Sequence, residues 1–196
     1  MTKLVLILFS ALFAENYVLV KFYGLCPFIG TSKNVRTSLG MALSVIGITT
    51  LSGALVWPIY RFILWPFDLT FLTTPAFLLV IAFLVQILEM LLEKHFSSLY
   101  NALGVYLPLI CVNCAIITTL RTVFSDFSAS FTHFFSAVFY CFAASLGFAF
   151  ALLLFAGVRK RIQEEDVPPH FRGVPMVLIS AGLVAIAFYA FSLMHF

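Results

Sequence analysis

Charged residues are scarce in this chain. Only 10% of its 196 residues are Asp, Glu, Lys or Arg, whereas soluble domains average about 25%. Hydrophobic residues make up 63% of the chain. A water-soluble domain of this length cannot cover so much apolar surface, so the composition indicates that the solvent is a lipid bilayer. We therefore expect residues 1–196 to form a single integral membrane domain.

Motifs for nucleotide binding and hydrolysis are also absent. The sequence contains no Walker loop, dinucleotide fingerprint, nucleophile elbow or H-E-x-x-H helix. The formal net charge of +3 is small, and the cations lie between apolar runs rather than in one basic patch. We expect no nucleic-acid partner and no direct nucleotide binding, and we assign no catalytic residue to this chain.

The apolar residues form runs that are long enough to cross a bilayer as helices, which takes about 20 residues. The runs are continuous rather than alternating, which favours helices over a β-barrel. Six spans are predicted, at 4–24, 38–60, 74–92, 100–120, 131–156 and 174–194. The start resembles a secretory signal, but no A-x-A site precedes Glu15, so we expect an uncleaved first helix. The fold class is predicted as an all-α polytopic membrane protein with six transmembrane helices.

The Lys and Arg residues between the spans predict the orientation. An even number of spans places both termini on one side, which carries Lys3, Arg61 and Arg121. Seven cations lie on the other side: Lys33, Arg36, Lys94, Arg159, Lys160, Arg161 and Arg172. Because cytoplasmic loops carry the excess of Lys and Arg, both termini are predicted to lie on the periplasmic side.

The two halves of the chain align with each other at an offset of 88 positions, which places Cys26 on Cys114. We predict two three-helix repeats, at about 1–95 and 99–196. An odd number of spans in each half inverts the second repeat relative to the first, about a pseudo-two-fold axis in the membrane plane. Equivalent residues meet only near that axis, where we expect Cys26 and Cys114.

Helix-breaking residues lie close to both cysteines. Gly24 and Pro27 flank Cys26, and Pro108 precedes Cys114 by six residues. Glycine loosens a helix, and proline lacks a donor and clashes with the preceding turn. Irregular backbone at membrane depth occurs where it is covered by protein or lines a cavity. We therefore predict broken helices around Cys26 and Cys114.

The sequence contains four cysteines, whose roles differ. Cys26 and Cys114 are interpreted as buried packing residues, as a disulfide, or as half of a Cys₄ iron–sulfur site that a partner completes. Cys111 and Cys114 form a C-x-x-C and could ligate one metal from one helix face. We favour a packing role for Cys111, and we expect Cys141 to be a small buried residue.

Several stretches resemble a known family, the small six-helix membrane subunits of the Rnf and Nqr respiratory complexes. They are "VLVKFYGLCPFIGTSK", "VQILEM", "YNALGVYLPLICVNCAI" and "DVPPHFRG", and the resemblance runs through nearly the whole chain. The opening "LVKFYGLCPF" is most similar to the A-type subunits of Rnf (Rsx) complexes. "LYNALGVYLPLI" is also similar to the E-type subunits of Nqr complexes. The chain departs from the family pattern at Cys111, where threonine is usual.

The resemblance implies a function in bacterial inner membranes. Such subunits pair with an inverted homologue, the E-type subunit of the Rnf complex, and share one [2Fe–2S] cluster with it; the matching ligands here are Cys26 and Cys114. The cluster carries electrons across the membrane. That transfer links NADH/ferredoxin redox chemistry to the movement of Na⁺ or H⁺, within a complex that also contains the B, C, D and G subunits. The chain would thus be one component of a translocase and not catalytic alone.

Four polar residues are further candidates. A cation at Lys21 would favour thiolates near Cys26, although its side chain could instead extend to the headgroups. Asn113 could donate to sulfur or to a neighbouring helix. Glu89 and Glu15 could lie on an ion path or make a structural contact.

Two further functions remain open from the residues alone. A stand-alone secondary transporter would also have inverted repeats, broken helices and an intramembrane carboxylate. A purely structural assembly component would explain the hydrophobicity but not the equivalent cysteines. Within the family, an Nqr subunit of the E type, from a Na⁺-translocating NADH:quinone oxidoreductase, is the alternative to an Rnf subunit of the A type.

Overall fold

The architecture is taken from a computed structural model of the chain. It describes residues 21–32, 35–60, 62, 72–95, 104–126, 134–164 and 173–194. Within these ranges all regular structure is helical and no strand occurs. The prediction of an all-α fold is therefore confirmed for the described part of the chain. Of the predicted first span at 4–24, the part up to residue 20, which includes Glu15, lies outside the described residues.

Three long helices match predicted spans. They are α3 (Val35–Ile59), α4 (Thr73–His95) and α8 (Phe134–Glu164), and each is long and apolar enough to cross a membrane. The C-terminal helix α9 (Val174–Met194) also matches its predicted span, with a shorter apolar stretch. The continuous apolar runs of the sequence thus form continuous helices.

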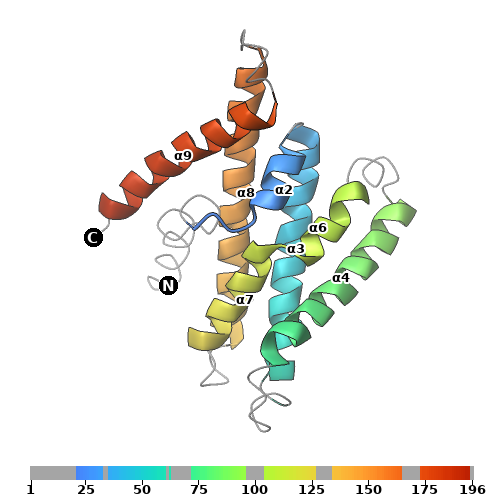
Figure 1. The fold of residues 1–196 in the computed structure, drawn as a ribbon. Helices are drawn as coiled ribbons and strands as arrows, with labels where there is room; N and C mark the ends of the chain where they lie inside the picture. Colours follow the sequence, from blue (N-terminus) through green and yellow to red (C-terminus); the bar gives the residue numbers. More distant parts are fainter. Residues whose placement is uncertain are drawn as a thin grey trace.

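The centre of the fold is the antiparallel pair α3 and α8, which make the most extensive contact between any two described helices. The pair runs side by side, with α4 against α3 and α9 against α8 on the opposite side (Figure 1). Met41 and Val45 of α3 and Phe155 of α8 belong to the buried core. The close approach depends on Gly53, where a Cβ would lie 2.7 Å from Cys141 Sγ.

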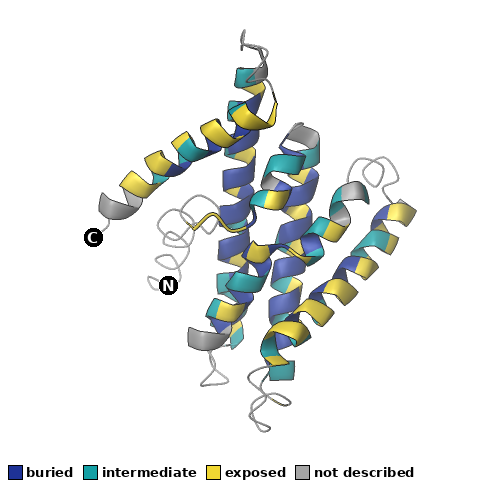
Figure 2. Cartoon of the chain, viewed as in Figure 1, coloured by how far each residue is buried: buried dark blue, intermediate teal, exposed yellow. Residues whose placement is uncertain are grey.

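The outward faces of the helices are apolar rather than polar. Leu79 and Phe83 of α4 and Leu183 and Ile186 of α9 are all exposed. Exposed positions follow the outer sides of α4 and α9, whereas α3 and α8 are largely buried (Figure 2). Contiguous apolar surface of this kind is rare in soluble monomers. The described surface therefore suits contact with lipid.

The predicted span at 100–120 is not one helix. The chain forms the 3₁₀ turn η4 (Gly104–Tyr106) and the short helix α6 (Leu107–Cys111), then breaks at Val112 and Asn113, and α7 (Cys114–Asp126) follows. The short helix α2 (Leu25–Thr31) begins directly after Gly24, which has a left-handed backbone with φ 83°. The predicted break beside Cys114 is confirmed. Beside Cys26 the backbone is irregular at Gly24, and the residues up to 20, where the preceding helix was predicted, lie outside the described residues.

The prolines act differently from the prediction. Pro27 and Pro108 each lie in the first turn of a helix, α2 and α6 respectively, rather than in a helix interior. Proline is tolerated there because the missing N–H has no partner within the helix. They therefore mark where the short helices start, and the backbone breaks lie at Gly24 and at Val112–Asn113.

Helix α8 extends to Glu164, eight residues beyond the predicted end of the fifth span at 156. The added residues are mostly Arg, Lys, Gln and Glu, which are good helix formers. The assignment of Arg159 to a loop between spans was wrong, because Arg159 lies within α8 and is buried. Its guanidinium contacts α2, which explains why a cation is found inside the fold.

Candidate functional site

The two backbone breaks meet each other. A Cβ on Gly24 would lie 3.0 Å from Asn113 Oδ1 and 3.1 Å from both Ala115 Cβ and Phe148 Cε2. The segment that precedes Cys26 therefore packs against the residues on either side of Cys114. Only a residue without a Cβ fits this contact, and the left-handed φ also favours glycine. We call this meeting point of α2 and α7 the cysteine junction.

Cys26 and Cys114 are both free thiols, and both are exposed. The neighbouring Phe22, Tyr23 and Val112 are also exposed, with 63% of Val112 accessible. Exposure at both cysteines does not fit the interpretation as buried packing residues. The cysteine junction thus presents two accessible thiols within an apolar surface.

Asn113 shapes the start of α7. Its side-chain Oδ1 accepts a hydrogen bond from the Ala115 N–H at 3.1 Å, and its main-chain carbonyl accepts one from the Ile116 N–H at 3.1 Å. This is an N-cap, which satisfies a donor that the first turn of the helix leaves open. The residue is 1% exposed, and no acceptor among the described residues pairs with Nδ2. An unpaired donor therefore lies beside Cys114.

The other end of α2 is held by side chains from α8 and α3. Arg159 Nη1 donates to the Ile29 carbonyl at 2.7 Å and to Ser32 Oγ at 2.6 Å. Ser38 Oγ donates to the Thr31 carbonyl at 3.0 Å. These bonds satisfy carbonyls that the last turn of a helix leaves without partners. Sequence reasoning missed Arg159, because no local pattern separates it from Lys160 and Arg161, which are both exposed.

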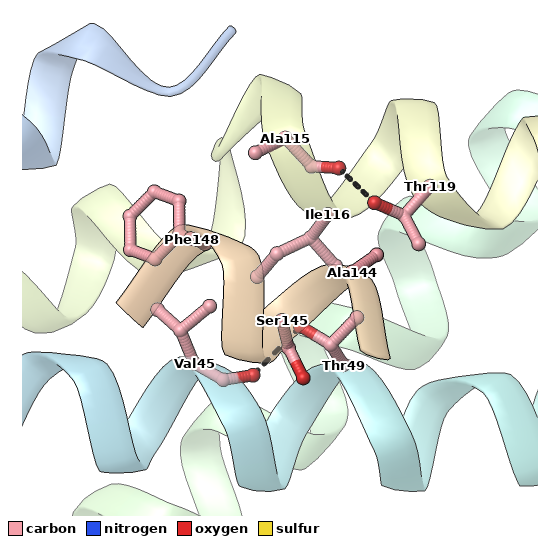
Figure 3. A pocket seen from close by; sticks show the side chains of 8 residues that line it. All are labelled: Val45, Thr49, Ala115, Ile116, Thr119, Ala144, Ser145 and Phe148. Atoms are coloured by element: carbon pink, nitrogen blue, oxygen red, sulfur yellow. Dashed lines mark hydrogen bonds between the residues drawn. The ribbon is translucent and has the colours of Figure 1, made fainter. Parts of the chain in front are cut away.

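A small cavity lies where α3, α7 and α8 meet, next to the cysteine junction (Figure 3). Its volume of about 10 Å³ has room for roughly one water molecule. Three hydroxyls line it, and each donates to its own helix: Thr49 to Val45 O at 2.6 Å, Thr119 to Ala115 O at 2.7 Å and Ser145 to Phe142 O at 2.8 Å. Since their protons are engaged, these hydroxyls offer acceptor lone pairs to the cavity.

The C-x-x-C pair is separated by the break. Cys111 ends α6 and Cys114 begins α7, so the rule that residues three apart share a helix face does not apply to them. Cys111 is partly buried and packs against the core. Cys141 is fully buried, as predicted.

Two further predicted residues, Lys21 and Glu89, differ in exposure. Lys21 is exposed, on the segment that leads to Gly24. Glu89 is half-buried on α4. Across the described ranges, no three His, Cys, Asp or Glu side chains gather into a set that could hold a metal ion. The donor set of the cysteine junction is thus two thiols.

Comparisons with known proteins agree on one family. The family model described as "Rnf-Nqr subunit, membrane protein" matches residues 4–195. The chain is 46% identical over 192 residues to the A subunit of the ion-translocating oxidoreductase complex of Alcanivorax borkumensis, covering 98% of this chain and 97% of the relative. It is 44% identical over 190 residues to the A subunit of the Na(+)-translocating ferredoxin:NAD(+) oxidoreductase complex of Acetobacterium woodii, covering 96% of each.

Proposed function

The chain belongs to the Rnf-Nqr family of membrane subunits, and we propose that it is an A-type subunit of an ion-translocating oxidoreductase complex in a bacterial inner membrane. In this role it carries electrons across the membrane by way of a [2Fe–2S] cluster that it shares with a homologous subunit. The observation that carries the proposal is the cysteine junction, where Gly24 contacts Asn113 and Ala115 and a free, exposed thiol lies near each side of that contact.

The donors of the chain fit half of such a cluster. Cys26 and Cys114 offer two thiolates of a four-cysteine set, and a homologous subunit of the Rnf E type supplies the other two. Phe22, Tyr23 and Val112 give the partner an apolar surface to cover around the thiols. When bound, the cluster takes up and passes on one electron at a time.

The residues around Cys114 suit a sulfur that ligates iron. Cys114 is the first residue of α7, where the positive end of the helix dipole favours a negatively charged bound group. The Asn113 Nδ2 group has no acceptor among the described residues, so it is available to donate a hydrogen bond to a cluster-bound sulfur in the assembled complex. Such bonds raise the reduction potential of iron–sulfur centres. Lys21 adds a positive charge on the segment that leads to Cys26.

The proposal includes two inverted three-helix repeats with six spans, and three residue pairs at the offset of 88 support it. Thr31 and Thr119 each donate to the carbonyl four residues before them, at 2.7 Å in both cases. Gly53 and Cys141 are also 88 apart, and they touch each other at the crossing of α3 and α8. Cys26 and Cys114, the third pair, flank the contact at the cysteine junction. Equivalent residues that meet lie near the axis that relates the halves.

The rest of the proposed function comes from the family. The Acetobacterium relative is named for Na⁺, ferredoxin and NAD⁺. By analogy, this protein couples NADH/ferredoxin redox chemistry to Na⁺ or H⁺ movement, together with the B, C, D, E and G subunits of the complex. It is not catalytic alone, and both termini lie on the periplasmic side. The identity of the neighbouring genes distinguishes this assignment from the Nqr E type.

Low-temperature EPR with iron quantification on the co-purified complex tests the proposal. We expect a [2Fe–2S] signal in the wild type that is lost in Cys26→Ser and in Cys114→Ser. Cys111→Ser is the matched control, because it lies three residues from Cys114 on the other side of the break, and it should retain the signal. A signal that survives both ligand substitutions would overturn the proposal.

A second candidate function, a stand-alone secondary transporter, is favoured by Glu89, a half-buried carboxylate on a membrane-length helix. It predicts ion flux by the purified chain alone in liposomes. This flux would be abolished by Glu89→Gln and unaffected by Cys114→Ser. Absence of flux without partner subunits would exclude this function.

A further inference from the structure

We infer that Arg159 is a positioning residue for the shared cluster, because it fixes helix α2 and thereby the thiol of Cys26. This inference rests on the proposed function. It starts from the length of α2, which has only 7 residues and no side-chain hydrogen bond at its N-cap. Isolated helices shorter than about 12 residues are not stable. Contacts from other parts of the chain must therefore hold α2 in place.

The hydrogen bonds from other helices are at the C-terminal end of α2, where Ser38 Oγ also donates to the Thr31 carbonyl. The guanidinium of Arg159 is bonded to the Ile29 carbonyl and to Ser32 Oγ, from 130 and 127 residues away in sequence. Arg159 is 7% exposed, and its Nε has no hydrogen-bond partner among the described residues. Burying a cation with an unpaired donor is unfavourable by itself. A cation at the end of a helix is favourable, because it complements the helix dipole.

Two further contacts leave α2 little freedom. A Cβ on Gly30 would lie 3.0 Å from Tyr106 Cε1, so the ring packs directly on the backbone of α2. At the start of α2, Gly24 abuts Asn113, Ala115 and Phe148. Arg159 and Ser38 are the hydrogen-bonding members of this set, and their bonds supply direction, since a hydrogen bond fixes angle as well as distance.

The bonded carbonyl is close to the thiol along the helix. Ile29 follows Cys26 by three residues, so the two lie one turn apart on the same face of α2. A displacement of the Ile29 carbonyl should therefore move Cys26 by a similar distance, because the two residues belong to one helical turn. Removing the guanidinium should change where the thiol stands relative to Cys114, without removing any ligand.

The test uses Arg159→Met in the intact complex, with Arg161→Met as the matched control because Arg161 is exposed on the same helix. We expect Arg159→Met to lower bound iron about twofold or more, and to shift the g-values and the reduction potential of the remaining cluster. Arg161→Met should match the wild type. Arg159→Lys keeps the charge and donors, so it should recover most of the iron.

A second measurement does not need the cluster. The full chain is expressed without its partner, and the rates at which a membrane-permeant maleimide alkylates Cys26 and Cys114 are compared. A displaced α2 changes the surroundings of the exposed Cys26 thiol, so Arg159→Met should raise the rate at Cys26 about threefold or more and leave the rate at Cys114 unchanged. Ser32→Ala, which removes one of the two acceptors, should change Cys26 in the same direction by less.

The outcomes separate this inference from the proposed function. Suppose that Cys26→Ser abolishes the cluster of the wild-type complex, but Arg159→Met matches the wild type in iron content, g-values, reduction potential and alkylation rates. The positioning role of Arg159 is then overturned, and the proposed function stands. If the cluster does not depend on Cys26, the proposed function fails, and with it this inference. If Arg159→Met does not assemble, the alkylation rate of Ser32→Ala decides: a rate at Cys26 equal to wild type overturns the inference.

Discussion

Helix α7, which begins with Cys114, and helix α2, which carries Cys26, meet at one junction but are stabilised in different ways. Helix α7 has 13 residues, and its first turn is capped by the adjacent side chain of Asn113. Helix α2 has 7 residues and no side-chain cap at its start. It is held at its end by Arg159, 130 residues away from the carbonyl that it binds.

In the internal repeat that we propose, positions 26 and 114 are equivalent, yet the helices that carry them are not stabilised by equivalent interactions. The thiol at 114 depends on its sequence neighbours, so local substitutions should disturb it. The thiol at 26 depends on side chains from the second half of the chain, so distant substitutions should disturb it. The variants below test this difference and the contact that joins the two helices.

Gly24→Ala should have the largest effect on stability, because its new methyl group would clash at the cysteine junction, where the start of α2 contacts the start of α7. The left-handed backbone and the three atoms within 3.1 Å of the new Cβ should together lower the free energy of unfolding by about 2–4 kcal/mol. Thermal unfolding of the purified subunit measures this. The control is Gly47→Ala, where a Cβ meets nothing within 4 Å. Equal midpoints for the two variants would contradict the structure.

Gly53→Ala should have the next largest effect, because its Cβ would overlap Cys141 Sγ at 2.7 Å. Separating α3 from α8 should lower the free energy of unfolding by about 1–3 kcal/mol. A double-mutant cycle with Cys141→Ala measures the coupling, since the smaller side chain should restore most of the loss. Strictly additive effects would show that the two residues do not touch.

Asn113→Ala tests the local support of α7. Loss of the N-cap should lower the free energy of unfolding by about 1 kcal/mol, whereas Asn113→Ser keeps a capping oxygen and should lower it by much less. The same pair of variants separates capping from the hydrogen bond that we propose to sulfur. Both lack the amide donor, so both should lower the reduction potential in the assembled complex. If the reduction potential falls in Asn113→Ala but stays at the wild-type value in Asn113→Ser, it depends on the cap, which would contradict the proposed role of Nδ2.

Thr31→Val and Thr119→Val should have the smallest effects. Each removes one buried hydroxyl that donates to the carbonyl four residues earlier, and such bonds contribute only about 0.5–1.5 kcal/mol. If the repeat is real, the two losses should agree within error in a thermal unfolding assay. A clear loss at 31 with none at 119 would show that the stability of α2 and α7 differs even at equivalent bonds.

The sequence predicted those parts of the fold that depend on local pattern. The limits of α3, α4 and α9 follow from continuous apolar runs, and the irregular backbone near Cys26 follows from Gly24. The end of α8 was wrong by eight residues, because a hydropathy pattern does not distinguish a charged helical turn from a charged loop.

The candidate site divides in the same way. Cys26 and Cys114 were identified from their spacing, and the exposure of both is a property of the folded chain. Asn113 was identified as a candidate, but its capping hydrogen bond was not predicted. The sequence predicted irregular backbone near Cys114, but it did not place the helix break at Val112 and Asn113. The role of Arg159 depends on packing between helices of different halves, which no local signal in one sequence reveals.

The distance in sequence between Arg159 and Ile29 also sets an order of events during synthesis. The two residues are 130 positions apart, and at about 5–20 residues per second a ribosome needs roughly 6–26 seconds to make the intervening chain. Throughout that time, the segment of the nascent chain that carries Cys26 lacks the Arg159 guanidinium, which bonds to the C-terminal end of α2 in the folded protein. The first thiol to be translated therefore gains the support of Arg159 only after the fifth apolar segment has been synthesised.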